Sequence, residues 1–403
     1  MLLVNWGEPS FSAPYPEGNI LTKHPQPSPF RIGISGSYGG FNLGDEAILQ
    51  SIVTQIRSIL KAEITVFSRD PEDTVRRHKI EKVVPVRKLS REEIEGEISK
   101  LDIFILGGGG ILYDADARTY LREPFIALEK EIPVMVYAIS AGPLHEPTTQ
   151  NLVRDCLNQV SVITVRDHHS RRVLEDAGVR RHIDVTADPA LLIAAEPLEE
   201  EVFKREGIDL QRRLVGISVR EPGVAAPDLN EESYHQILAN TADYIIDRFN
   251  SDVVFIPMER KVLDLQHSHA VISLMLRPQN ATVLQGNYTS GQLLSIIGRL
   301  NFAVGMRLHF LIFAALQQIP FVGLPYSSKV NGFLEEMHLE MPPLHLVNAG
   351  RLIAHIDHAW DNRLSVLQRI KRYLPELKER AGLNGSALHK LINKRREDRP
   401  EVT

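Results

Sequence analysis

Cationic side chains and one histidine follow strand-like segments in the C-terminal half of the chain. The segment at residues 301–305, NFAVG, is followed by Arg307 and His309, and Lys329 comes after the next such segment, PFVGL. Parallel strands present their carboxyl ends at one edge of a sheet, so we expect these side chains to lie close together. The set suits an anionic ligand and a proton transfer, whereas the alternative for a histidine before an apolar helix is a core or capping role.

Two further arginines end strand-like segments. Arg166 follows SVITV, and Arg220 ends RLVGISVR. A guanidinium at a strand end can bind a carboxylate or a phosphate. The alternative for both is a salt bridge, which for Arg166 would involve Asp167 or a neighbouring loop.

A glycine-rich turn, GSYGGFNLGDEAIL, links the first strand-like segment to a helix. Its glycine spacing resembles a P-loop, but Asp45 and Glu46 stand where Lys and Ser or Thr would hold phosphates, and no GxGxxG pattern is present. The turn therefore favours neither an NTPase nor a dinucleotide-binding protein. Asp45 is either a carboxylate favoured by the helix dipole or a functional group beside a glycine-lined cleft.

Four consecutive glycines, Gly107 to Gly110, follow the segment DIFIL. Glycine in a regular element costs about 0.5–1 kcal/mol relative to alanine, so a bare backbone there needs a reason. The two explanations are the close approach of a ligand and tight packing alone.

Metal and covalent catalysis have little support in the sequence. The pairs His267 with His269 and His355 with His358 have ligand-like spacing, but no local cysteine or carboxylate completes a site. No GxSxG pattern occurs, and Cys156 lies within an expected helix as a packed small residue. We therefore expect no metal site.

Short apolar segments alternate with helical ones along most of the chain, which predicts an α/β protein with parallel sheets. A first series of strands runs from residue 31 to 165 and a second from 213 to 324, with a proline-containing acidic break near residues 187–213. The expected parts are an extended leader (1–30), an N-terminal Rossmann-like domain (31–190), a C-terminal Rossmann-like domain (212–360) and C-terminal helices (361–403).

Composition restricts the class of protein further. The chain has 403 residues, of which 43% are apolar and 24% charged, and its net charge is -5. These values exclude a disordered chain and a globally basic nucleic-acid binder. One cysteine cannot form an internal disulfide, and no signal peptide or membrane-spanning run is recognisable, so we expect a cytoplasmic protein.

The C-terminal segment is basic, with eleven Lys or Arg against six Asp or Glu in residues 361–403. We expect two helical stretches there, separated by Gly382 and Gly385. The basic side chains belong either to solvated helix faces or to a peripheral contact with an anionic membrane surface.

Six segments in this order resemble the polysaccharide pyruvyl transferase family, over roughly residues 31–337. They are GSYGGFNLGDEAIL, ILGGGGIL, YAISAGPL, ITVRDHHSRRVLEDAG, ADPAL and GMRLHFLIFAALQQIPFVGLPYSSKVNGF. The resemblance implies a GT-B-like fold, with two Rossmann-like domains facing a cleft and a C-terminal helix that packs back on the N-terminal domain.

The resemblance also implies a reaction. The enolpyruvyl group of phosphoenolpyruvate would be transferred to two hydroxyls of a sugar or lipid-linked glycan, giving a pyruvate ketal and phosphate, in cell-envelope or exopolysaccharide biosynthesis and without a metal or redox cofactor. Arg307 and Lys329 would hold the donor with help from Arg166 or Arg220, His309 would be the acid, and Asp45 would bind or deprotonate the acceptor. Further substrate contacts are expected from Asn42, Gly44, Gly108, Gly109 and Leu308.

Two other functions remain open at this point. A nucleotide-sugar glycosyltransferase of the same architecture would need a carboxylate for the ribose, and Glu335 or Glu336 could serve. A non-catalytic sugar-binding protein would use the cations structurally. Partners expected in addition are the inner face of the cell membrane and a second copy of the chain.

Overall fold

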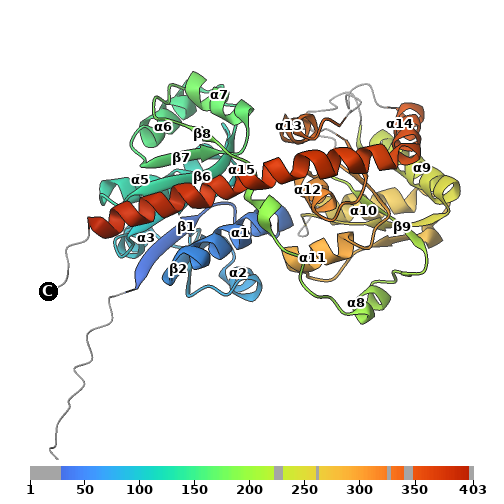
Figure 1. The fold of residues 1–403 in the computed structure, drawn as a ribbon, viewed down its shortest axis with the longest axis horizontal. Helices are drawn as coiled ribbons and strands as arrows, with labels where there is room; N and C mark the ends of the chain where they lie inside the picture. Colours follow the sequence, from blue (N-terminus) through green and yellow to red (C-terminus); the bar gives the residue numbers. More distant parts are fainter. Residues whose placement is uncertain (1–28, 222–229, 260–262, 325–327, 340–347, 399–403) are drawn as a thin grey trace, which may run out of the picture.

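The computed structural model describes residues 29–221, 230–259, 263–324, 328–339 and 348–398. Of the expected leader, residues 1–28 lie outside this part. The described chain contains two parallel sheets, one in an N-terminal domain (residues 30–185) and one in a C-terminal domain (residues 213–361). Figure 1 shows the two domains side by side.

The N-terminal sheet has eight strands in the order β3-β2-β1-β4-β6-β7-β8, with β5 paired to β6. The strands are β1 (Phe30–Ser35), β2 (Ala62–Ser68), β3 (Lys82–Pro85), β4 (Ile103–Leu106), β5 (Gly109–Leu112), β6 (Val134–Ala141), β7 (Val162–Val165) and β8 (Asp184–Val185). The helices are α1 (Leu43–Ile59), α2 (Pro71–Arg77), α3 (Arg91–Ile98), α4 (Ala117–Tyr120), α5 (Arg122–Glu129), α6 (Pro147–Leu157) and α7 (His168–Asp176). Strands β4 and β6 are buried along their whole length, as expected for parallel strands covered by helices on both faces.

The C-terminal sheet has five strands in the order β11-β10-β9-β12-β13. The strands are β9 (Arg213–Ser218), β10 (Ser251–Phe255), β11 (Ala281–Val283), β12 (Phe302–Gly305) and β13 (Phe321–Gly323). The helices are α9 (Glu231–Phe249), α10 (Leu263–Ser273), α11 (Ser290–Ile297), α12 (Leu308–Leu316), α13 (Ser328–Glu336) and α14 (Ala349–Asp361). The 3-10 turn η1 (Pro189–Leu192) and helix α8 (Glu200–Arg205) connect the two domains, and a second 3-10 turn, η3 (Pro278–Asn280), precedes β11.

One of the apolar clusters spans both domains. It includes Ile52 of α1, Leu293 of α11, Phe310 of α12 and Leu388 of the C-terminal helix α15 (Arg363–Glu397). A backbone hydrogen bond also joins the two domains: the N–H of Leu43 donates to the carbonyl of Met258 at 2.9 Å. The start of α1 is therefore fixed against the other domain.

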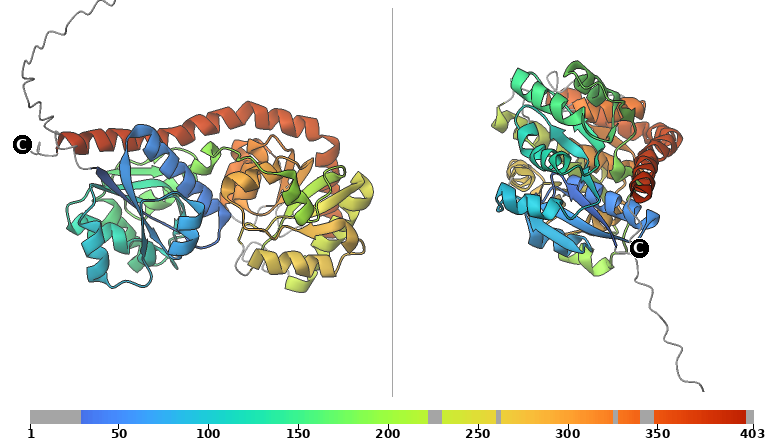
Figure 2. Two further views of the ribbon diagram at one scale, coloured as in Figure 1. Left: turned by 90° about the horizontal axis from the view of Figure 1, so that it is seen from below. Right: turned by 90° about the vertical axis from the view of Figure 1, so that its left-hand side faces the viewer.

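The C-terminal segment forms one helix, α15 (Arg363–Glu397), which crosses both domains (Figures 1 and 2). The expected break at Gly382 and Gly385 is wrong. Both glycines lie inside the helix, and a Cβ at Gly385 would overlap the side chain of Gln55 on α1. The glycine thus permits close packing of two helices, and Asn384 beside it binds the carbonyl of Ala187 at 3.2 Å.

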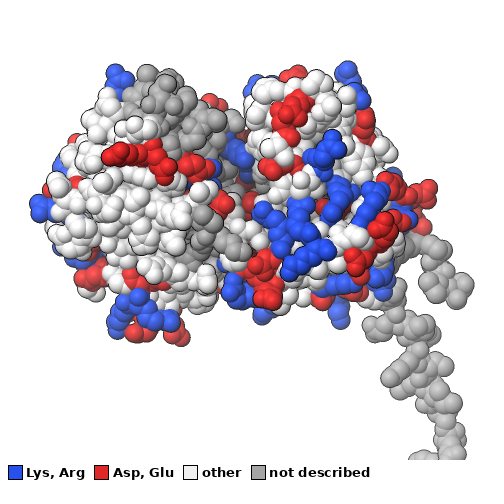
Figure 3. All heavy atoms as spheres, turned by 180° about the vertical axis from the view of Figure 1, so that it is seen from behind, with Lys and Arg blue, Asp and Glu red and all other residues white. Residues whose placement is uncertain are grey.

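None of the described helices is both long enough and apolar enough to span a membrane. Cys156 is fully buried in α6, where burial raises the pKa of its thiol to about 12. Lys and Arg side chains gather over the N-terminal domain in the view from behind (Figure 3), so a chain with net charge -5 still carries local positive charge.

Candidate active site

The first turn of α1 holds two carboxylates with different surroundings. Asn42 caps the helix by accepting a hydrogen bond from the N–H of Gly44 at 3.0 Å. Glu46 accepts from the N–H of Gly39 at 2.9 Å and lies 2.8 Å from Nε2 of His78, so it is bound within its own domain. Asp45 is left to face the C-terminal domain.

Asp45 is 8% exposed and lies beside groups from both domains. Burial raises the pKa of its carboxyl, and the positive charges of His309 and Lys329 partly oppose this effect. A Cβ at Gly109 would stand 3.0 Å from Oδ1 of Asp45, and this glycine has a φ of 99°, so the carboxylate lies against bare backbone. A carboxylate whose pKa is raised accepts a proton more readily than an ordinary one.

His309 lies in the first turn of α12 and reaches across to the N-terminal domain. Its ring is packed against Gly44, where a Cβ would overlap Nδ1. Its Nε2 lies 3.5 Å from Oδ2 of Asp188, and this nitrogen is buried without a hydrogen bond inside the described ranges. The imidazole is thus held between two segments of the N-terminal half, with one nitrogen facing a carboxylate.

Asp188 links His309 to Arg166. The Nη1 of Arg166 donates to Oδ2 of Asp188 at 2.8 Å, Asp167 lies 3.8 Å from the same guanidinium, and both members of the closer pair are buried. Burial alone would raise the pKa of Asp188, but the charges of His309 and Arg166 outweigh it and lower the pKa. Arg166 therefore forms a salt bridge, although not chiefly with Asp167.

The low pKa of Asp188 predicts a pH dependence of folding stability. Its contribution is complete above the ordinary carboxyl pKa of 3.8 and is lost as the pH falls below that value towards the folded pKa. We expect the melting temperature to fall between about pH 4 and pH 2, and to fall less steeply for Asp188→Asn. Equal slopes for both proteins would contradict this ionisation of Asp188.

A pocket of about 150 Å³ opens beside these residues, between the ends of β6 and β7 and helix α13. Its lining carries charges of both signs. The basic side chains are Arg166, His168, His169, Arg172 and Lys329, and the acidic ones are Asp167, Asp188, Glu335 and Glu336. Asp45 and His309 are not part of the lining, but each lies near a residue that is: His309 is 3.5 Å from Asp188, and the charge of Lys329 acts on Asp45. The pocket offers an anion several cationic groups from two domains.

Lys329 is the cation that the C-terminal domain contributes to this pocket. Its Nζ lies 4.6 Å from the ring centre of Tyr113, and a Cβ at Gly110 would overlap the same nitrogen. A cation over an aromatic face remains available for an anion, because the ring neutralises none of its charge.

Arg307 takes a different place from the one expected. Its Nε donates to Oδ2 of Asp264 at 2.9 Å, and its Nη2 lies 2.9 Å from Oε2 of Glu259. Asp264 is fully buried and Arg307 is 7% exposed. Two carboxylates thus compensate this guanidinium, and Arg307 is not a lining residue of the pocket.

Arg220, Leu308 and the remaining glycines are placed as follows. Arg220 forms an ion pair with Glu221 and is absent from the pocket lining, whereas Leu308 is part of it. A Cβ at Gly108 would stand 3.0 Å from Ile48 and 3.1 Å from a carbonyl of β6, so packing explains this glycine. In the glycine run, Gly109 and Gly110 are the members that face the site.

The structure thus brings together Asp45, Gly44, Gly109, His309 and Lys329, with Arg166 adjoining. It adds residues that sequence reasoning missed: Tyr113, His168, His169, Arg172 and Asp188. A usable signal was present, because HHSRR begins two residues after the strand-end Arg166 and Asp188 lies in the segment ADPAL.

Side chains spaced for a metal ion also come together at one place within the described ranges, away from the pocket. They are Glu231, His235 and His267.

Comparison with known proteins agrees with these observations. Residues 42–328 match the model of a family described as polysaccharide pyruvyl transferase. No curated protein is similar to the chain at a significant level.

Several solved structures share the fold. A UDP-GlcNAc 2-epimerase from Neisseria meningitidis, bound to UDP-GlcNAc, superimposes with a TM-score of 0.59 at 10% identity, over 89% of this chain and 99% of its own. A glycosyltransferase from Rickettsia africae gives 0.59 at 11% identity, over 91% and 99%. A UDP-GlcNAc 2-epimerase from Methanocaldococcus jannaschii gives 0.57 at 12% identity, over 81% and 92%. The expected GT-B-like α/β fold with parallel sheets is confirmed.

Proposed function

Because the chain belongs to the polysaccharide pyruvyl transferase family and is therefore a transferase, we propose that its donor is phosphoenolpyruvate. In this proposal two hydroxyls of one sugar residue in a glycan acceptor receive the pyruvyl carbon, and phosphate leaves. The observation that carries the proposal is the meeting of Asp45, His309 and Lys329 from two domains beside a pocket whose lining includes two arginines and this lysine as well as four carboxylates.

The pocket supports a small, highly charged donor. Phosphoenolpyruvate carries about three negative charges at neutral pH, one on the carboxylate and about two on the phosphate. Arg172 and Lys329 reach the pocket from opposite domains, and Arg166 adds a third cation that Asp188 already compensates in part. We assign Lys329 to binding of the donor. Arg307 already has two carboxylate partners, so we assign it a role in supporting the fold of the site.

Ketal formation needs one proton on carbon and the loss of two hydroxyl protons. An acid protonates the methylene carbon of the donor, so the adjacent carbon becomes an oxocarbenium centre. The first hydroxyl attacks that carbon as its proton is removed. The second attacks as the bond to the phosphate oxygen breaks, and its proton balances the released phosphate. No electron is gained or lost, so the step requires no redox cofactor.

His309 and Asp45 are the groups we assign to these protons. Asp188 lies 3.5 Å from Nε2 of His309 and so helps to fix the orientation of the imidazole. Burial raises the pKa of Asp45, which makes its carboxylate a stronger base than an ordinary aspartate.

The contact between Gly44 and His309 gives a sharp test of this assignment. Gly44→Ala places a methyl group where Nδ1 now lies, while alanine remains compatible with the helix α1. A misplacement of about 1 Å can cost about 10²-fold in rate, so we expect a loss of that order in turnover. Gly96→Ala is the matched control, because this helical glycine has open space around it and should keep full activity. Normal turnover of Gly44→Ala would argue against His309.

The experiment for the function itself combines binding with product analysis. Phosphoenolpyruvate at 100 times its Kd should stabilise the protein by about 2.7 kcal/mol, which appears as a raised melting temperature. Phosphate release in the presence of a panel of glycosides, with mass detection of the ketal, then identifies the acceptor. Stabilisation by UDP-linked sugars instead would favour a glycosyltransferase, and stabilisation by neither would favour a non-catalytic protein.

The proposed acceptors are precursors of cell-envelope or exported polysaccharides, free or lipid-linked. Such a reaction draws phosphoenolpyruvate from the cytoplasm, so we propose action there, at the inner face of the membrane when the acceptor is lipid-linked.

A further inference from the structure

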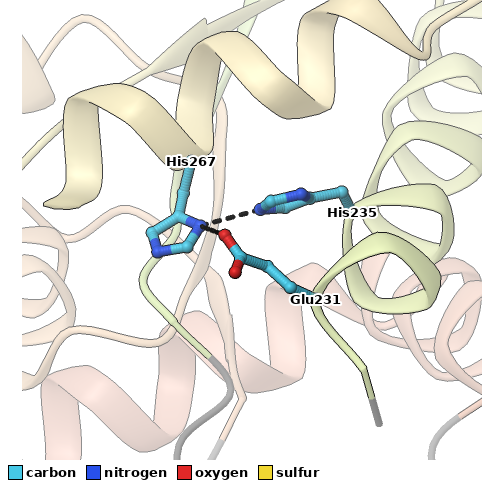
Figure 4. Close-up of side chains that lie close together, drawn as sticks. All are labelled: Glu231, His235 and His267. Carbon is cyan, nitrogen blue, oxygen red and sulfur yellow. Dashed lines mark hydrogen bonds and ion pairs between the residues drawn. The ribbon is translucent and has the colours of Figure 1, made fainter.

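Three side chains of the C-terminal domain converge outside the candidate active site (Figure 4). Glu231 and His235 come from α9, and His267 comes from α10. Each offers one ligand atom, and the three atoms lie within 4.8 Å of one another. Nε2 of His235 is 2.7 Å from Nδ1 of His267, and Oε1 of Glu231 is 3.6 Å from the same Nδ1.

The sequence gives no direct sign of this cluster, but the fold explains it. Glu231 and His235 are four residues apart on α9, so they lie on the same face of the helix, one turn apart. His267 lies on the facing side of α10, whereas His269, its partner in the ligand-like spacing noted above, is exposed. The third ligand therefore comes from a helix that is distant in sequence.

We infer that Glu231, His235 and His267 bind a divalent transition-metal ion, with Zn²⁺ the best match. Two imidazole nitrogens and one carboxylate oxygen form a common three-residue zinc set, which water completes to four ligands. Both histidines are buried, and the side chain of Glu231 is 68% exposed, so the cluster has a solvated entrance.

The present spacing is close to that required. A tetrahedral ion with bonds of about 2.0–2.1 Å separates two nitrogens by about 3.3 Å. The two nitrogens lie 2.7 Å apart, the spacing of a hydrogen bond between the rings, so one ring must move by about half an ångström. This hydrogen bond is the competing explanation, and the test below separates the two.

The charges around the cluster do not prevent cation binding. Arg220 and Arg307 lie near His267, but each pairs with acidic side chains. Asp264, one turn before His267 on α10, is the fully buried partner of Arg307. An ion bound between α9 and α10 would therefore hold α10 in place, and α10 carries Asp264, the carboxylate that binds Arg307.

Titration of the full chain, without a histidine tag and after removal of metals by EDTA, tests the inference. The chain contains 15 histidines, so stoichiometry and variants are both needed. We expect one tight equivalent of Zn²⁺ by calorimetry and visible absorption of a tetrahedral site when Co²⁺ replaces it. Glu231→Ala should weaken Zn²⁺ binding about tenfold or more, and His235→Gln with His267→Gln should abolish the tight equivalent.

The controls distinguish a metal site from two alternatives: a hydrogen-bonded histidine pair that binds no metal, and non-specific binding of Zn²⁺ to other histidines. Glu231 is exposed, so its replacement should leave the fold intact, and His269→Ala on the same helix should bind Zn²⁺ like the original chain. No tight equivalent, or the same affinity in Glu231→Ala as in His269→Ala, would overturn the inference. Activity is not used as a readout, so failure here leaves the proposed transfer reaction untouched.

Discussion

Replacement of His309 by alanine is expected to lower the rate of ketal formation by about 10² to 10⁴ while the protein still binds phosphoenolpyruvate. The reason is that the imidazole supplies a proton, whereas Arg172 and Lys329 line the pocket that receives the donor. The measurement is kcat from the rate of phosphate release, with donor binding followed as a shift in melting temperature.

Two comparisons make the His309 result specific. His269→Ala removes an exposed imidazole from the same domain and should leave kcat unchanged. His309→Ala should also lose one limb of the pH profile of kcat, which a variant that merely loosened the domain contact would keep. Loss of donor binding together with unchanged kcat at saturation would show that His309 binds the donor and does not transfer the proton.

The strands and the family could be predicted from the sequence because their signals are local. Buried parallel strands appear as short runs of Val, Ile and Phe, and the two predicted series, over residues 31–165 and 213–324, correspond to the two sheets. The short strands β5 and β8 were missed. Strand β5 begins inside the glycine run at Gly109, where composition indicates a turn, and β8 has two residues.

The partners of charged side chains could not be predicted, because they depend on contacts between distant segments. Arg166 and Asp188 are 22 residues apart, and Arg307 and Asp264 are 43 residues apart. A guanidinium at a strand end looks the same in the sequence whether its charge is compensated or free for a ligand. The cluster of Glu231, His235 and His267 could not be predicted for the same reason, because His267 lies on a different helix from the other two residues.

Glycines show a related limit of sequence reasoning. A glycine in a helical pattern indicates a break, and Gly382 with Gly385 suggested one in the C-terminal segment. The structure keeps α15 continuous, because Gly385 allows close contact with Gln55 and the helix gains packing across both domains. Tertiary contact therefore outweighed the local propensity, which costs about 1 kcal/mol for a glycine.

Arg307→Met is expected to destabilise the protein by about 3–5 kcal/mol, the usual cost of leaving a buried charge without its partner. Asp264 is fully buried and accepts from the Nε of Arg307 at 2.9 Å, as well as from the backbone N–H groups of Met258 and Glu259. Once the guanidinium is removed, the carboxylate keeps those two backbone donors among the residues that the structure describes. Urea unfolding of both proteins measures the difference.

A second substitution decides whether Arg307 acts only through the fold. Asp264→Asn in the Arg307→Met background removes the unpaired charge but keeps an oxygen that can accept from Met258 and Glu259, so most of the lost stability should return. If Arg307 supports the site only by fixing α12, the double variant should recover near-normal KM for phosphoenolpyruvate together with its stability. If Arg307 instead contacts the donor, KM stays raised in a stable protein, since no restored packing replaces a missing cation. Unchanged stability of Arg307→Met alone would show that solvent, and not the guanidinium, neutralises Asp264, and the assignment of Arg307 to the fold would then be wrong.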